Sequence, residues 1–239
     1  RHFLVDAGAE SDPEAFERRR NTAVPDPRLF SLLMNILIIF WGLIWLVRMI
    51  GQNMNKGKYE GNLNIYCHED LIPVIRTITD LTIQKKVTKH IGERILLTPV
   101  AHGETREILD CPVTFFDIYS TKAKQYGFTM MLPGNVKFTC AGDEPYNEKD
   151  YEFAKDSDWL MHEAFCLYSE ADEFGPYEKH HSTVKEACQT AEELKIPNLI
   201  LYHTEDKNIA RRKELYTEEG KEYYHGNLYV PDDMEVFEL

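Results

Sequence analysis

Side chains suited to acid–base or metal chemistry follow four apolar, strand-like segments of the sequence. Asp6 follows FLV and Asp143 follows VKFTCAG. Glu163 follows WLMH, and His203 follows LILY. In layered α/β folds, sites form where strands end, because strands fix the backbone while the following loops leave side chains free. The pattern favours one shared site, and the alternative is a turn-capping Asp6, a solvated Glu163 and a core His203.

These candidate residues lie in an alternation of short apolar strands and helical stretches. The alternation is typical of an α/β fold. The clearest helix covers 183–195, where Thr183 and Glu186 form a capping box and the apolar residues fall on one face. Further helices are expected at 13–20 and 69–83. Strands are expected at 2–8, 61–68, 93–100, 106–119, 127–132, 135–143, 157–165 and 198–203.

Length, amino-acid composition and net charge limit the class of protein that this chain can be. The chain has 239 residues, of which 43% are hydrophobic and 28% charged, with a net charge of −13. This predicts a single soluble domain over 1–239 and argues against a general nucleic-acid or anionic-membrane partner. The five cysteines form no CxxC pair, and RHFLVDAGAE lacks the order of a signal peptide. We therefore expect free thiols and a cytoplasmic location.

The stretch 29–50, LFSLLMNILIIFWGLIWLVRMI, is apolar over nearly the length that a transmembrane helix needs. The alternative is a buried strand followed directly by a buried helix. No other segment of the chain approaches membrane length. We favour the second interpretation and expect no membrane partner.

Four motifs, CAGDEPYNE, DWLMHEAFC, HHSTVKEACQTAEEL and NLILYHTED, occur in this order. Together they resemble the second half of a metallo-β-lactamase-superfamily hydrolase of the ribonuclease Z branch. The resemblance implies an αββα sandwich with two mixed sheets, possibly without the first strands. It also implies that Asp143 and His203 are metal ligands and that Glu163 and His181 transfer protons to the leaving group. Zinc or manganese would be the metal of the parental family.

The sequence departs from this family where the first metal loop, His-x-His-x-Asp-His, is expected. Alignment on the following helix places Met34, Ile36, Ile38 and Ile39 at the four ligand positions, and Tyr119 at that of a further histidine. None of these side chains binds zinc well, so only Asp143 and His203 remain. A dinuclear site needs about five to seven ligands. The residues 9–41 are therefore atypical for the family.

We therefore expect a dismantled metal site, with no bound cofactor and no parental hydrolysis. Such a chain would be a redesigned scaffold or binding protein, or a natural pseudoenzyme. Residues 30–45 would then bind an apolar small molecule or a protein partner, or simply pack as core. The candidates for an apolar site are Met34, Ile36, Ile38, Ile39, Phe40, Trp41 and Tyr119.

An active enzyme is the alternative. It would be a hydrolase of phosphodiesters or related esters that uses Asp143, His203 and further ligands such as His181 or His162. Lys122 and Lys124 stand next to the expected site and would contact a phosphate or remain solvated.

Overall fold

The computed structural model describes the backbone of residues 3–5, 30–32, 37–232 and 235, and the side chains from Gly42 onward. The predicted helix at 13–20 and the residues Asp6, Met34 and Ile36 lie outside this part of the chain. Ile38, Ile39, Phe40 and Trp41 belong to a helix whose side chains are described only from Gly42. The contacts divide the chain into two compact units, 1–101 with 123–126 and 102–122 with 127–239. The expectation of one domain remains a prediction.

The first unit contains a four-stranded sheet and three helices. The strands pair in the order β1-β2-β3-β4, and all three pairs are parallel. We expected a mixed sheet, and the strands described here are parallel throughout. The strands are β1 (Phe3–Val5), β2 (Phe30–Leu32), β3 (Leu63–Cys67) and β4 (Ile95–Pro99). The helices are α2 (Leu37–Asn55), α3 (Leu71–Thr82) and α4 (Lys85–Thr88).

The apolar run of the sequence becomes β2 and α2, in agreement with the expectation of a strand followed by a helix. Leu43, Val47 and Ile50 are fully buried and lie three to four residues apart, on one face of α2. Gly51 lets α2 approach α4, because a Cβ there would lie 2.5 Å from Val87 Cγ1. Among the described residues, no helix is both long and apolar enough to cross a membrane.

The second unit is built on a mixed sheet of seven strands in the order β11-β10-β9-β8-β7-β6-β5. Strands β8 to β11 are parallel, whereas β7 pairs with β8 and β5 with β6 in the antiparallel sense. The strands are β5 (Thr105–Ile108), β6 (Cys111–Asp117), β7 (Tyr126–Leu132), β8 (Val136–Cys140), β9 (Trp159–Glu163), β10 (Asn198–Tyr202) and β11 (Asn227–Tyr229). The helices are α5 (Tyr151–Ala154), α6 (Ala171–Phe174), α7 (Val184–Glu193) and α8 (Arg212–Gly220).

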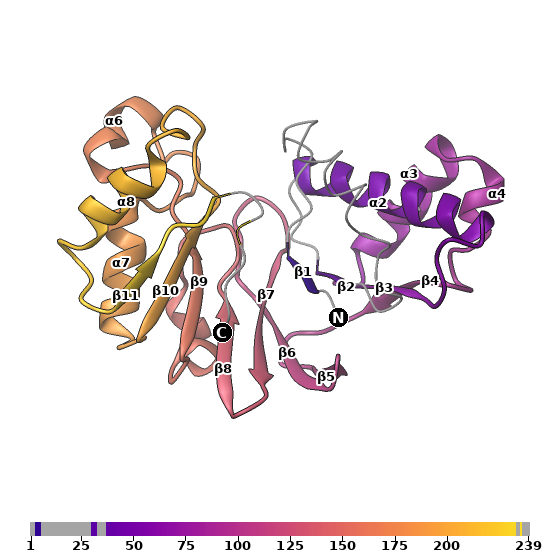
Figure 1. Ribbon diagram of the computed structural model, residues 1–239, viewed down its shortest axis with the longest axis horizontal. Helices are drawn as coiled ribbons and strands as arrows, with labels where there is room; N and C mark the ends of the chain where they lie inside the picture. The colour runs from indigo at the N-terminus through magenta and orange to yellow at the C-terminus, as the bar shows by residue number, and fades with distance from the viewer. Residues whose placement is uncertain (1–2, 6–29, 33–36, 233–234, 236–239) are drawn as a thin grey trace. The chain divides into compact units, whose positions relative to one another are not determined.

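Helices α7 and α8 cover the parallel part of this sheet (Figure 1). The buried face of α7 consists of Val184, Ala187, Cys188 and Ala191, and these small side chains let the helix lie close to Leu160 and the other core residues of β9 and β10. The capping box expected from the sequence is present at Thr183 and Glu186. The sequence therefore predicted the start and the buried face of α7 correctly.

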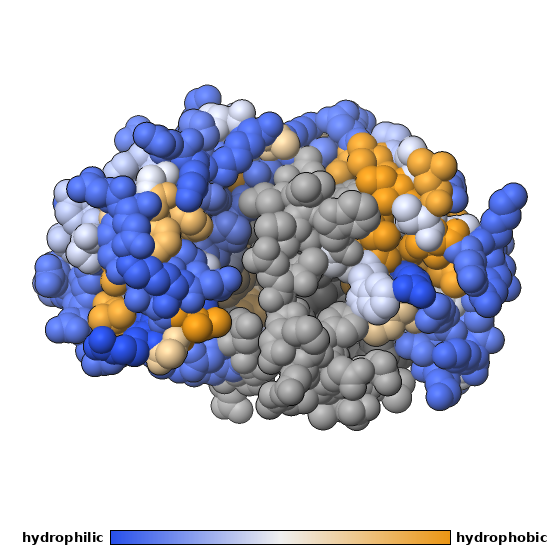
Figure 2. All heavy atoms as spheres, turned by 90° about the horizontal axis from the view of Figure 1, so that it is seen from above, coloured by the Kyte–Doolittle hydropathy of each residue, from blue (hydrophilic) through white to orange (hydrophobic). Residues whose placement is uncertain are grey.

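On the face drawn in Figure 2, the two units differ in surface character. Figure 2 shows a group of hydrophobic atoms on the first unit and mainly hydrophilic atoms on the second. In the first unit Trp45, Val74 and Leu81 expose large apolar side chains, and the Arg48 guanidinium lies 4.8 Å from the centre of the Trp45 ring. Of the apolar partner site expected at 30–45, side chains are described only for the last four residues.

Candidate active site

The strand register of the second unit brings three predicted site residues to one edge of the sheet. Glu163, the last residue of β9, lies opposite Tyr202, the last residue of β10. The Ala141 amide, just past β8, donates a 2.9 Å hydrogen bond to the carbonyl of Met161. Because β8, β9 and β10 are parallel, their carboxyl ends lie at the same edge. Asp143, Glu163 and His203 therefore emerge from neighbouring strand ends.

A glycine positions Asp143 at this edge. Gly142 has a φ of +92°, and a Cβ there would lie 2.7 Å from Ile118 Cδ1. This backbone conformation and the close approach both favour glycine. The turn leaves the Asp143 side chain fully buried.

Glu163 and His181 form the pair that the resemblance implied. Glu163 is fully buried, and its Oε1 accepts a short hydrogen bond from the Ser182 amide. Its Oε2 lies 3.5 Å from His181 Nδ1. Burial raises the pKa of Glu163 to about 7, while His162, the Ser182 hydrogen bonds and Lys122 oppose this shift. The carboxyl group thus changes protonation near neutral pH, as a proton-transfer group must.

His181 and His203 lie side by side, with their ring centres 5.1 Å apart. Burial lowers the pKa of each imidazole to about 4, and the Lys122 ammonium adds to the effect. Both rings are therefore neutral at neutral pH, which is the form that binds metal. His203 follows β10 with a φ of +56°, so its backbone leaves the strand direction at once.

Phe165 connects the loops that carry the two histidines. Its amide donates to the Ser182 carbonyl at 2.9 Å, and its carbonyl accepts from the Glu205 amide at 2.7 Å. Its ring stacks on His181 with 4.9 Å between ring centres. Phe165, two residues after Glu163, therefore holds both histidine loops in place.

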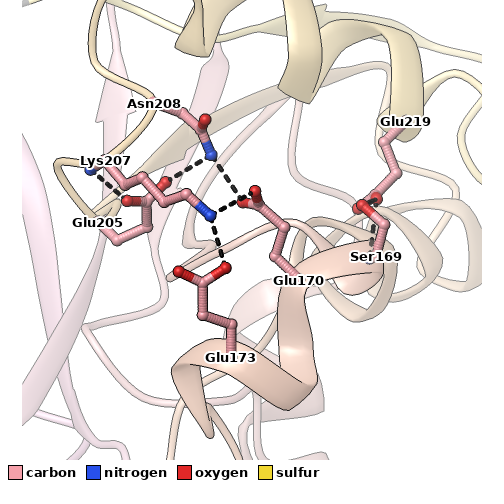
Figure 3. A network of polar contacts seen from close by, with 7 residues as sticks. All are labelled: Ser169, Glu170, Glu173, Glu205, Lys207, Asn208 and Glu219. Carbon is pink, nitrogen blue, oxygen red and sulfur yellow. Dashed lines mark hydrogen bonds and ion pairs between the residues drawn. The ribbon is translucent and has the colours of Figure 1, made fainter.

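A polar network holds the loop after His203. Figure 3 shows Lys207 Nζ between the carboxylates of Glu170 and Glu173, at 3.2 and 2.5 Å. Asn208 Nδ2 donates to Glu170 at 2.6 Å and to Glu205 at 3.0 Å. The loop thereby joins the segment 168–174, whose first amides donate to Glu219.

Lys122 also reaches this site, where the sequence left open whether it contacts a phosphate or remains solvated. Its Nζ lies 3.3 Å from His181 Nε2. Glu144, directly after Asp143, accepts hydrogen bonds from Ser120 Oγ at 2.7 Å and from the Thr121 amide at 3.2 Å. Sequence reasoning missed Glu144, although its position next to Asp143 was a usable signal.

Other predicted residues lie elsewhere or face away. His162 precedes Glu163 on β9, so its side chain points to the opposite face of the sheet. Its Nδ1 bonds to the Glu163 carbonyl at 2.6 Å, which does not favour it as a ligand. Tyr119 is 39% exposed, and Lys149 Nζ lies 4.4 Å from the centre of its ring.

The fit to a metal centre is incomplete. Asp143 and His203 carry the right donor atoms, but the described residues contain no group of three or more His, Cys, Asp or Glu that could hold an ion. A dinuclear centre needs more ligands than these two. The segment aligned with the first metal loop contributes no described side chain, so the described residues alone do not fit a dinuclear centre.

Two sheets with helices packed around them, one sheet mixed and seven-stranded, define an α/β protein of the metallo-β-lactamase fold. The metallo-β-lactamase fold protein YhfI from Bacillus subtilis matches 99% of this chain and 87% of its own, with a TM-score of 0.72 and 17% identity. The short form of human tRNase Z also matches 99% of this chain and 87% of its own, with a TM-score of 0.69 and 16% identity. These matches confirm the predicted fold.

The sequence is similar to that of ribonuclease Z. The ribonuclease Z of Thermococcus sibiricus is 34% identical over 104 residues, which cover 44% of this chain and 32% of that protein. The chain thus spans about a third of the length of the curated relative it matches. No family model matches the sequence.

Proposed function

We propose that this chain is a ribonuclease Z-like hydrolase of phosphodiesters or related esters. The observation that carries the proposal is the buried pair of Glu163 and His181 beside His203, with 3.5 Å between Glu163 Oε2 and His181 Nδ1. The similarity to ribonuclease Z supports the substrate class.

The cost of burying these groups supports a functional role. Glu163, Asp143 and His181 are 0%, 0% and 7% exposed. Burying a charged or polar group destabilises a fold unless a partner compensates for the lost water. Apolar residues would pack at this edge at lower cost. Polar residues kept in such a place are therefore typical of a site that performs chemistry.

The residues have distinct roles in hydrolysis. Asp143 and His203 would be ligands of divalent metal, which would supply activation of water and stabilisation of negative charge. When the phosphorus–oxygen bond breaks, the leaving oxygen needs a proton. Glu163, whose carboxyl group holds a proton near neutral pH, is the source of this proton. As the imidazole of His181 gives one proton to the leaving oxygen, it takes one from Glu163, so the ring stays neutral and Glu163 becomes a carboxylate. The 3.5 Å separation is typical of a proton-transfer contact that tightens on substrate binding.

Hydrolysis of a chromogenic phosphodiester in zinc or manganese tests the proposal. We expect turnover, and a decrease in kcat of about 10²- to 10⁴-fold in His181→Asn. His180→Asn is the matched control, because the neighbouring histidine is exposed and should retain activity. Absence of turnover with every divalent metal would overturn the proposal.

A second candidate is a binding protein or scaffold, natural or redesigned, whose metal site is dismantled. The absence of a three-ligand group among the described residues favours it, together with Met34, Ile36, Ile38 and Ile39 in the sequence. Its ligand would be an apolar small molecule or a protein partner at 30–45.

Metal content separates the two candidates. Protein purified without chelator and soaked in zinc or manganese should contain about two ions per chain if it is the hydrolase. A metal content near zero, with no turnover, favours the binding protein.

A further inference from the structure

We propose that Lys122 binds a phosphate oxygen of the substrate at this site, an inference that rests on the proposed function. Lys122 Nζ is the donor to His181 Nε2 at 3.3 Å, so an ammonium lies beside the proton-transfer pair. An ammonium and a phosphate oxygen form a charge-assisted hydrogen bond.

Hydrogen bonds hold the backbone of the loop that carries this lysine. Glu144 is 5% exposed, and its two oxygens accept from Ser120 Oγ and the Thr121 amide. Ser120 Oγ in turn accepts from the Lys122 amide at 3.2 Å. Ser120 and Thr121, the two residues before the lysine, are therefore anchored to Glu144, and the Lys122 amide is anchored through Ser120.

The charge environment distinguishes Lys122 from other lysines of this acidic chain. Lys124 Nζ lies 3.6 Å from Asp70, and Lys207 and Lys213 each pair with two carboxylates. In the described part of the chain, no carboxylate pairs with Lys122 within 4.0 Å. Its charge thus remains available to an anionic ligand.

The contact between Lys122 and His181 also determines which imidazole nitrogen carries the hydrogen when no ligand is bound. An ammonium only donates, so His181 Nε2 accepts, and the ring proton lies on Nδ1 toward Glu163 Oε2. A phosphate that takes the Lys122 contact releases Nε2, so that the ring can then carry its hydrogen on Nε2 and accept a proton from Glu163 at Nδ1. Phosphate binding and the state of His181 are therefore coupled through one hydrogen bond.

Titration of chelator-treated, metal-free protein with inorganic phosphate tests the inference, with the imidazole nitrogens of His181 observed by NMR. We expect phosphate to shift the Nε2 signal, and Lys122→Met to weaken binding at least about tenfold. Lys122→Arg should retain most of the binding. Lys124→Met, two residues along, should bind like the wild type.

Glu144→Gln is a second variant. It keeps Lys122 but disturbs the hydrogen bonds that hold the loop before it, so it should weaken phosphate binding less than Lys122→Met. Equal binding by Lys122→Met and the wild type, or no shift at His181, would overturn the inference. If a short RNA binds more tightly than inorganic phosphate, the contact is assigned to a phosphate of the RNA backbone. If inorganic phosphate binds more tightly, the contact is assigned to free phosphate.

The titration contains no metal and measures no turnover. Phosphate binding without hydrolysis therefore contradicts the proposed function alone, whereas hydrolysis with unchanged binding in Lys122→Met contradicts the role of the lysine alone.

Discussion

At the scale of single residues, Gly142 determines where Asp143 lies. Gly142→Ala should lower the free energy of unfolding by about 2–4 kcal/mol, because a positive φ and a clash with Ile118 act together. Gly134→Ala is the matched control: its φ is +85°, but nothing lies within 4 Å of the added Cβ. Urea unfolding should show a smaller loss, about 1–2 kcal/mol, for the control. Equal losses of stability in the two variants would mean that the Ile118 side chain moves aside at no cost.

Asp150 provides a prediction on pH. Its carboxyl group is buried, and burial raises its pKa to about 7, with Asp117 adding to the shift and Lys149 opposing it. The ordinary pKa is about 3.9. Between these values the folded protein binds more protons than the unfolded chain, so this group destabilises the fold as pH rises from about 4 to about 7.

Asp150→Asn removes that dependence. Relative to the wild type, the variant should gain stability as pH rises from about 4 to about 8, since the amide carries no charge to bury. Chemical unfolding of both proteins at several pH values measures the difference. A constant difference across that range would contradict the raised pKa.

At the scale of elements, the start of α7 supports the histidine loop. The Thr183 amide donates to Glu186 Oε2 at 2.8 Å, and the Val184 amide donates to the Cys166 carbonyl at 3.0 Å. Thr183→Ala should lower the free energy of unfolding by about 1 kcal/mol, because the helix loses its capping side chain.

Thr190→Ala on the same helix is the control for Thr183→Ala. It removes the same hydroxyl away from the cap and should be neutral or slightly stabilising, because alanine favours helix. Thermal unfolding of the two variants compares them directly. Equal melting temperatures would exclude a capping role for Thr183.

The elements themselves were mostly readable from the sequence. Apolar segments such as NLILY and WLMHE predicted β10 and β9, since runs of this length bounded by polar residues form buried strands. Helix α8 and strand β11 were missed. Helix α8 has no strong apolar face, and β11 has only three residues, so neither carries a clear periodic signal.

At the scale of the whole molecule, the five cysteines give a test of burial. All five are free and buried, and burial raises the pKa of Cys67, Cys166 and Cys188 to about 12. Because the thiolate is the reactive form, native protein should react slowly with a thiol reagent. After unfolding in guanidinium, all five should react quickly. Fast reaction of the native protein would contradict the buried positions.

The sequence by itself determined the strand ends that carry Asp143, Glu163 and His203, because a buried strand and the polar residue after it are local features. It also gave the capping box of α7. Only the tertiary structure placed His181 against Glu163 and brought Lys122 to the same imidazole. The first contact joins residues that are 18 positions apart in the sequence, and the second joins residues that are 59 positions apart. The register of the parallel strands and the hydrogen bonds of the loops bring these residues together. Hydrophobic patterning specifies which residues are buried, whereas the packing of the second unit decides which buried polar groups meet.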